Sequence, residues 1–127
     1  MRRSEQRRAA VVALYQQDVT GRPAQELLDR DSSLFTKELV EGVEVEREEL
    51  DALIEKHAEG WTLDRIAPLE RNILRVGLHE LVHRSDIPDE VAIDEAVEAA
   101  KELCGAEAPK FVNGILGTVQ RGQATAR

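Results

Sequence analysis

The chain has 127 residues, enough for a single domain with one hydrophobic core. Hydrophobic residues make up 42% of it but aromatic residues only 3%, so the core must consist of leucine, valine, isoleucine and alanine, as in helix bundles. The net charge of −8 argues against nucleic acid as a default ligand. No apolar run follows the N-terminal arginines or reaches the roughly 20 residues that span a membrane, so we expect a cytoplasmic protein without a signal peptide.

The first half of the chain is expected to be helical, because apolar residues recur at helical spacing. Helices are predicted over Ser4–Thr20, from Pro23 to Arg30 and over Leu34–Glu59. In the third of these, Gly42 and Glu46 interrupt the apolar stripe. A kink, a break into two helices or a close approach of another backbone would explain the interruption.

The second half is organised around a helix that starts at Pro68. Its apolar residues cover most of its circumference, which predicts the central helix of a bundle. Trp61 precedes this helix and is predicted to be a core residue between two halves of the bundle. A short turn is predicted over residues 63–66. After the helix from Pro68, residues 85–87 form a turn, and a helix from Pro88 follows.

The last helix is predicted from Pro109 to Arg121, and no segment reads as a β-strand. We therefore predict an all-α fold, a compact bundle of six to seven helices in two small subdomains. The expected boundaries are one domain over 1–121, with N-terminal helices over 4–59 and C-terminal helices over 62–121, and a disordered tail over 122–127.

One motif suggests enzymatic chemistry. Residues 79–83 read His-Glu-Leu-Val-His, the H-E-x-x-H pattern in which two histidines share a zinc ion and the glutamate acts as general base. No third ligand follows at the usual spacing and no sheet is predicted to shape a cleft, so we favour a chance match. A zinc-dependent hydrolase using His79, Glu80 and His83 remains the alternative from another class. Otherwise no catalytic, metal or cofactor site is predicted, and Cys104, the single cysteine, ends an apolar stripe and is expected in the core.

The charge of the chain is unevenly distributed. Residues 1–8 hold four arginines and one glutamate, while the rest is strongly acidic. A basic tip on an acidic body permits a local phosphate contact that the net charge conceals.

Three stretches form a recognisable combination: RRAAVVALYQ at 7–16, the segment 69–101 with ILRVGLHEL and DIPDEVAIDEAVEAAK, and KFVNGIL at 110–116. In this order and spacing they resemble the NusB family of bacterial transcription antitermination factors. FTKELVEGV and the pair Trp61-x-Leu63 also fit the family pattern, so the resemblance covers nearly the whole chain.

The resemblance implies a non-enzymatic factor without cofactors. It would bind the boxA segment of nascent RNA together with NusE, the small-subunit ribosomal protein, within an RNA polymerase antitermination complex that reads through terminators, notably in rRNA operons. Carried over by position, the expected RNA-binding residues are Arg2, Arg3, Arg7, Arg8, Tyr15, Lys110 and Phe111. The residues expected to face NusE are Asp64, Glu70 and Glu80.

The residue chemistry is compatible with these roles, because single-stranded RNA is bound by cations that meet phosphates and by rings that stack on bases. Tyr15 and Phe111 would equally suit a core. A helical adaptor that binds protein but not RNA is therefore a further alternative. The sequence leaves monomer and homodimer open.

Overall fold

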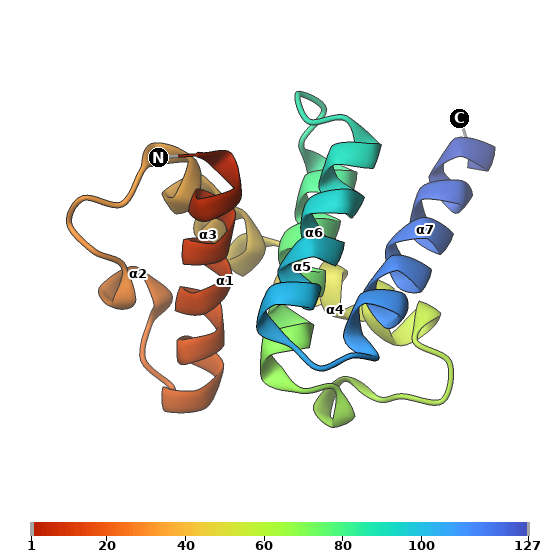
Figure 1. Cartoon of the computed structure of the whole chain (residues 1–127), viewed down its shortest axis with the longest axis horizontal. Helices are drawn as coiled ribbons and strands as arrows, with labels where there is room; N and C mark the ends of the chain where they lie inside the picture. The colour runs from red at the N-terminus through yellow and green to blue at the C-terminus, as the bar shows by residue number, and fades with distance from the viewer. Residues whose placement is uncertain (1, 127) are drawn as a thin grey trace.

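The computed structural model describes residues 2–126, and over that range it contains seven α-helices, one 3-10 helix and no strand (Figure 1). The helices are α1 (Arg3–Thr20), α2 (Ala24–Leu27), α3 (Leu34–Val45), α4 (Arg47–His57), the 3-10 helix η1 (Leu63–Arg65), α5 (Pro68–His83), α6 (Asp89–Leu103) and α7 (Ala108–Ala126). The predicted all-α fold is confirmed. Within the described range, no helix is both long enough and apolar enough to cross a membrane.

Helix α5 is the centre of the bundle, as predicted. Every residue from Asn72 to Leu81 is buried, and α5 packs against α1, α3, α4, α6 and α7. Figure 1 shows α1–α3 gathered in one half of the molecule and α4, α6 and α7 in the other. Because neighbouring helices cover α5 on several sides, its apolar residues are spread over most of its circumference, and its buried polar side chains are paired inside the protein.

The long helix predicted over residues 34–59 is two helices, α3 and α4, that meet at Glu46. Of the three explanations offered for the interrupted apolar stripe, the break into two helices is the one that the structure shows. A Cβ atom on Gly42 would lie 2.2 Å from Cε1 of His79. The glycine is therefore needed because the His79 ring of α5 occupies the space where a side chain would stand.

The C-terminal end differs from the prediction. Helix α7 continues past Arg121 to Ala126, where a disordered tail over 122–127 was expected. Gly122 lowers helix propensity, but it follows several formed turns of α7, and extending an existing helix is easier than starting one. Arg127 lies outside the described residues.

Candidate nucleic-acid and protein interface

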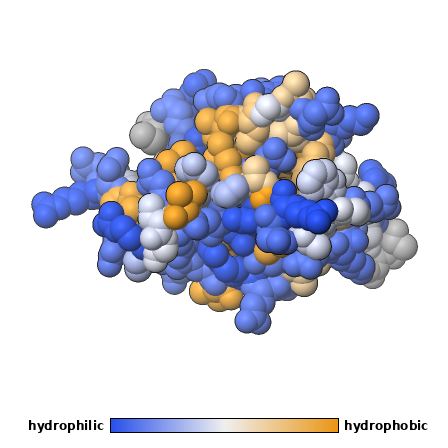
Figure 2. Space-filling view, turned by 90° about the horizontal axis from the view of Figure 1, so that it is seen from below, coloured by the Kyte–Doolittle hydropathy of each residue, from blue (hydrophilic) through white to orange (hydrophobic). Residues whose placement is uncertain are grey.

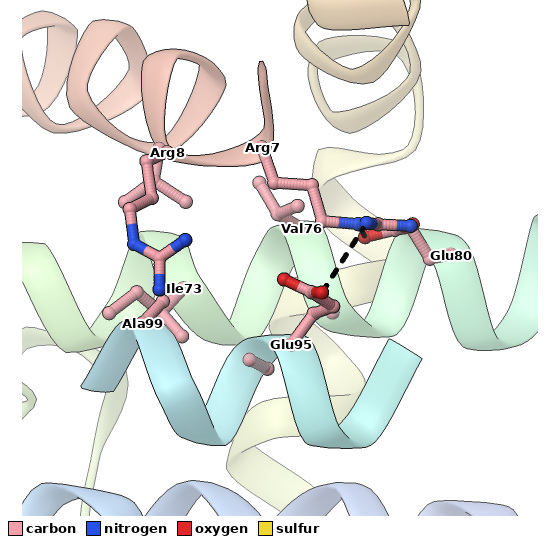
Figure 3. A pocket seen from close by; sticks show the side chains of 10 residues that line it. Arg7, Arg8, Ile73, Val76, Glu80, Glu95 and Ala99 are labelled. Carbon is pink, nitrogen blue, oxygen red and sulfur yellow. Dashed lines mark hydrogen bonds and ion pairs between the residues drawn. The ribbon is translucent and has the colours of Figure 1, made fainter. Parts of the chain in front are cut away.

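Arg7 and Glu80, expected at two different interfaces, form one buried ion pair (Figure 3). Nε of Arg7 donates to both carboxylate oxygens of Glu80 at 2.9 Å, and Nη2 lies 2.8 Å from Oε2. Arg7 is 8% exposed and Glu80 1%. Glu95 of α6 extends the pair, with its Oε1 4.0 Å from Nη1 of Arg7.

The pair joins α1 to α5 and α6 inside the protein. Neither side chain reaches solvent well enough to contact RNA or a partner in this structure, so we leave Arg7 and Glu80 out of the candidate surfaces. The family pattern marks both positions, and burial supplies a structural reason for the residue types there. Sequence reasoning missed the pairing because the two residues stand far apart in the chain and charged residues are exposed by default.

A second buried polar cluster joins α1 to α4 and α5 around Asp18. Its carboxylate accepts hydrogen bonds from Asn72 at 2.9 Å and from Arg75 at 2.8 Å, and Arg75 also pairs with Asp51 at 2.7 Å. Burial alone would raise the pKa of Asp18, but the hydrogen bond from Asn72 and the charge of Arg75 outweigh it, so this pKa lies below its usual value of 3.8. The cluster holds the fold together and is not a surface site.

The H-E-x-x-H residues do not form a peptidase site. His79 is buried with its Nδ1 2.7 Å from Oε1 of Glu46, and His83 hydrogen-bonds to Glu49. Glu80, the base in such an enzyme, faces Arg7 instead. A zinc ion held by the histidines would therefore have no glutamate base from this motif.

The other three N-terminal arginines are accessible to different degrees. Arg2 is exposed and forms a 3.3 Å pair with Glu5. Arg3 is exposed and its guanidinium lies 3.9 Å from the centre of the Phe35 ring. The side chain of Arg8 is 20% exposed and lies 2.9 Å from a carboxylate oxygen of Glu102. Such partially exposed pairs are weak enough to exchange for a phosphate.

Trp61 is not a core residue, contrary to the prediction. It is 51% exposed and follows Gly60, whose φ of 78° turns the chain outward after α4. Its ring meets Phe111 edge to face, with the ring centres 6.3 Å apart and the planes at 68°. The two rings lie at the mouth of a groove between η1, the start of α5 and the start of α7.

We call this groove the ring pocket; its lining includes Trp61, Arg65, Glu70, Lys110 and Phe111. Figure 2 views the end of the molecule on which η1 and the loop before α7 lie, and hydrophobic patches interrupt its hydrophilic surface there. Arg65 and Lys110 are exposed, and neither forms an ion pair within residues 2–126. Sequence reasoning identified Lys110 and Phe111 but missed Trp61 and Arg65, which the chain brings in from another segment.

The two remaining acidic residues expected to face a protein partner lie beside the same pocket. Glu70 lines it, and Asp64 is exposed on η1, where a hydrogen bond from Thr62 is the largest influence lowering its pKa.

Burial, with a smaller effect from Glu70, raises the pKa of the Cys104 thiol to about 11. Cys104 is thus protonated at neutral pH and is not an activated nucleophile.

Tyr15 is half-buried and shares a face of α1 with Arg8 and the exposed Val12. Arg8 pairs with Glu102 near the end of α6. Glu70 of the ring pocket contributes to raising the pKa of Cys104, which follows the last residue of α6. Tyr15 and Arg8 therefore offer a ring and a cation on α1, and neither residue lines the ring pocket.

Comparison with known proteins identifies the family of the chain. The model of the NusB family matches residues 4–121. The chain belongs to the NusB family. It is 45% identical to the transcription antitermination protein NusB of Rubrobacter xylanophilus over 122 residues, which cover 91% of this chain and 88% of that protein.

Solved NusB structures share the fold. NusB of T. maritima superposes with a TM-score of 0.85 at 34% identity, covering 95% of this chain and 92% of the other. NusB in a crystal structure with NusE and dsRNA superposes with a TM-score of 0.82 at 30% identity, covering 96% of this chain and 99% of the other. The chain is therefore a NusB-family transcription antitermination factor and not an enzyme, as the sequence predicted.

Proposed function

We propose that this protein binds boxA-type single-stranded RNA together with NusE. In this role it would act in the cytoplasm as part of an RNA polymerase antitermination complex and support read-through of terminators, notably in rRNA operons. The observation that supports the RNA assignment most strongly is the ring pocket. Two partly exposed aromatic rings lie there beside Arg65 and Lys110, neither of which forms an ion pair within residues 2–126, and Glu70 and Glu107 complete the charged lining. A solved NusB structure contains NusE and dsRNA, which supports NusE and RNA as classes of partner.

The chemistry of the pocket suits single-stranded RNA. Every base has a flat face, and stacking on an aromatic side chain contributes roughly 1–3 kcal/mol per base. Arg65 and Lys110 would meet the phosphates, and Lys110 lies in the first turn of α7, where backbone N–H groups without helical partners favour an anion. An adaptor that binds only protein has no need for this combination of rings and free cations.

We assign further RNA contacts to Arg2, Arg3, Arg8 and Tyr15, which lie on accessible parts of α1. Asp64 and Glu70 are assigned to NusE, because an acidic surface complements a basic ribosomal protein. Glu70 lines the ring pocket itself, so the RNA and NusE would meet at this end of the molecule. Such an arrangement would make binding of the two partners interdependent.

Replacing Lys110 by alanine is expected to weaken RNA binding and to flatten its salt dependence. Loss of one phosphate contact with single-stranded RNA should reduce the slope of log K against log salt by about 0.7. The measurement is a fluorescence titration of labelled boxA-type RNA at several salt concentrations. Lys37→Ala, which removes an exposed lysine on α3 away from the pocket, is the matched control. Equal slopes for the parent and both variants would remove Lys110 from the interface.

A further inference from the structure

The break between α3 and α4 lies against the end of α5, and three metal-binding side chains meet there. They are Glu46 at the break, Glu49 in the first turn of α4 and His83 at the last position of α5. Their ligand atoms all lie within 4.8 Å of one another. We propose that Glu46, Glu49 and His83 bind a divalent transition-metal ion, for which Zn²⁺ is the best chemical match.

The donor set suits zinc. Zn²⁺ binds imidazole nitrogen and carboxylate oxygen at about 2.0–2.2 Å in a tetrahedron, so neighbouring ligand atoms stand roughly 3.4 Å apart. Nε2 of His83 already lies 3.6 Å from Oε1 of Glu46. Glu49 hydrogen-bonds to the same nitrogen, so its carboxylate needs only a side-chain rotation to become the third ligand. Water would take the fourth position, and the two carboxylates balance the charge of the ion.

A buried histidine, His79, lies beneath the three ligands and holds one of them in place. His79 is 5% exposed, and its Nδ1 lies 2.7 Å from Oε1 of Glu46. Its ring stacks on that of His83, with centres 6.2 Å apart and an angle of 28°. The ring fits there only because Gly42 has no side chain.

Metal-binding carboxylates are commonly fixed by such outer hydrogen bonds, so His79 would act as a positioning residue for Glu46. No lysine or arginine within residues 2–126 forms an ion pair with Glu46 or Glu49, whose pairs are with histidines alone. A metal ion at the cluster would therefore not have to displace a lysine or arginine side chain. By joining α4 to the end of α5, the ion would link the two halves of the bundle. This inference is independent of the proposed RNA-binding function.

The site differs from the H-E-x-x-H peptidase arrangement in its residues and in its consequence. It uses one histidine of that motif as a ligand and takes its carboxylates from α3 and α4. Glu80 remains paired with Arg7, so no base stands beside the ion and no hydrolysis is expected. The role is structural.

The test is calorimetric titration of ZnCl₂ into the full chain, purified without a metal-binding tag and treated with EDTA, with Co²⁺ absorption as a second readout. We expect saturable binding of one ion per chain and visible Co²⁺ bands of tetrahedral intensity. His83→Gln and Glu49→Gln should each weaken binding more than about tenfold, since loss of an outer-shell partner alone costs roughly 10- to 100-fold. Zn²⁺ should raise the melting temperature of the parent but not of His83→Gln.

The matched control is His57→Gln. His57 lies on α4, with its Nδ1 2.9 Å from the carbonyl oxygen of Leu53, and it contributes nothing to the cluster. This variant should bind Zn²⁺ as the parent does. Both ligand positions are exposed, so the variants are expected to keep the parental circular dichroism spectrum in EDTA. The proposal would be overturned if the parent did not bind Zn²⁺ saturably, or if His83→Gln and Glu49→Gln bound Zn²⁺ as tightly as the parent. The cluster would then consist only of histidine–glutamate hydrogen bonds.

Discussion

Replacing Glu80 by alanine is expected to lower the free energy of unfolding by about 3–5 kcal/mol, because it leaves the buried guanidinium of Arg7 with only Glu95, 4.0 Å from Nη1, as a charged partner. The lost contacts are the two 2.9 Å hydrogen bonds from Nε of Arg7 and the 2.8 Å contact from Nη2. The position is almost fully buried, so water cannot replace the carboxylate. Urea unfolding followed by circular dichroism measures the change.

Glu98→Ala is the control for this variant. Glu98 forms an exposed pair with Lys101 at 3.2 Å on the same protein, and such surface pairs contribute at most about 1 kcal/mol. If Glu80→Ala lowers the unfolding free energy no more than Glu98→Ala does, the buried pair of Glu80 with Arg7 does not stabilise the fold.

Stability must also be measured for Arg7→Ala, because unfolding of this variant would by itself reduce RNA binding.

Replacing Asp18 by asparagine is expected to cost about 3 kcal/mol of stability, near the lower end of the range for breaking a buried pair. Arg75, whose side chain is 4% exposed, would keep only Asp51 as a charged partner. The asparagine amide has the shape of the aspartate carboxylate but lacks its charge, so the decrease in stability measures the contribution of the ion pair. Asp31→Asn, on the exposed turn before α3, is the control and should change stability little.

The contribution of Asp18 should also depend on pH in a defined direction. Its pKa in the folded protein lies below 3.8, so the unfolded chain takes up the proton first as the pH falls. Stability from this group is therefore fully present above about pH 5 and is lost as the pH falls through the folded pKa. Chemical unfolding should show that the parent exceeds Asp18→Asn in unfolding free energy by a constant amount near neutral pH, and by a smaller amount below about pH 4. A difference in unfolding free energy that grows in acid would contradict the assignment.

The sequence predicted the helices well because helix formation is read from local spacing. The broad apolar surface of the segment after Pro68 correctly indicated a central helix. Gly42 and Glu46 correctly marked an irregular place in the third segment, but their spacing did not distinguish a break from a kink or a close approach of another backbone. What approaches Gly42, the ring of His79, could not be read from local spacing, since it depends on how α3 packs on α5.

The candidate site was predicted only in part, for the same reason. Lys110 and Phe111 follow from the family pattern at the start of one helix. Trp61 was wrongly expected in the core because large apolar residues are usually buried, yet the outward turn at Gly60 places it on the surface. The family resemblance assigned Arg7 to an RNA surface and Glu80 to a NusE surface, and only the three-dimensional fold shows that the two are paired and buried.

A comparison of two RNA ligands shows whether the ring pocket of the parent protein binds unpaired bases. Labelled boxA-type RNA is titrated as a single strand and as a duplex with its complement, at fixed salt, with and without NusE. Because the rings of Trp61 and Phe111 need unpaired bases to stack on, we expect the single strand to bind more tightly than the duplex, and NusE to tighten it further. Equal binding of the two ligands, unchanged by NusE, would contradict a boxA-binding ring pocket.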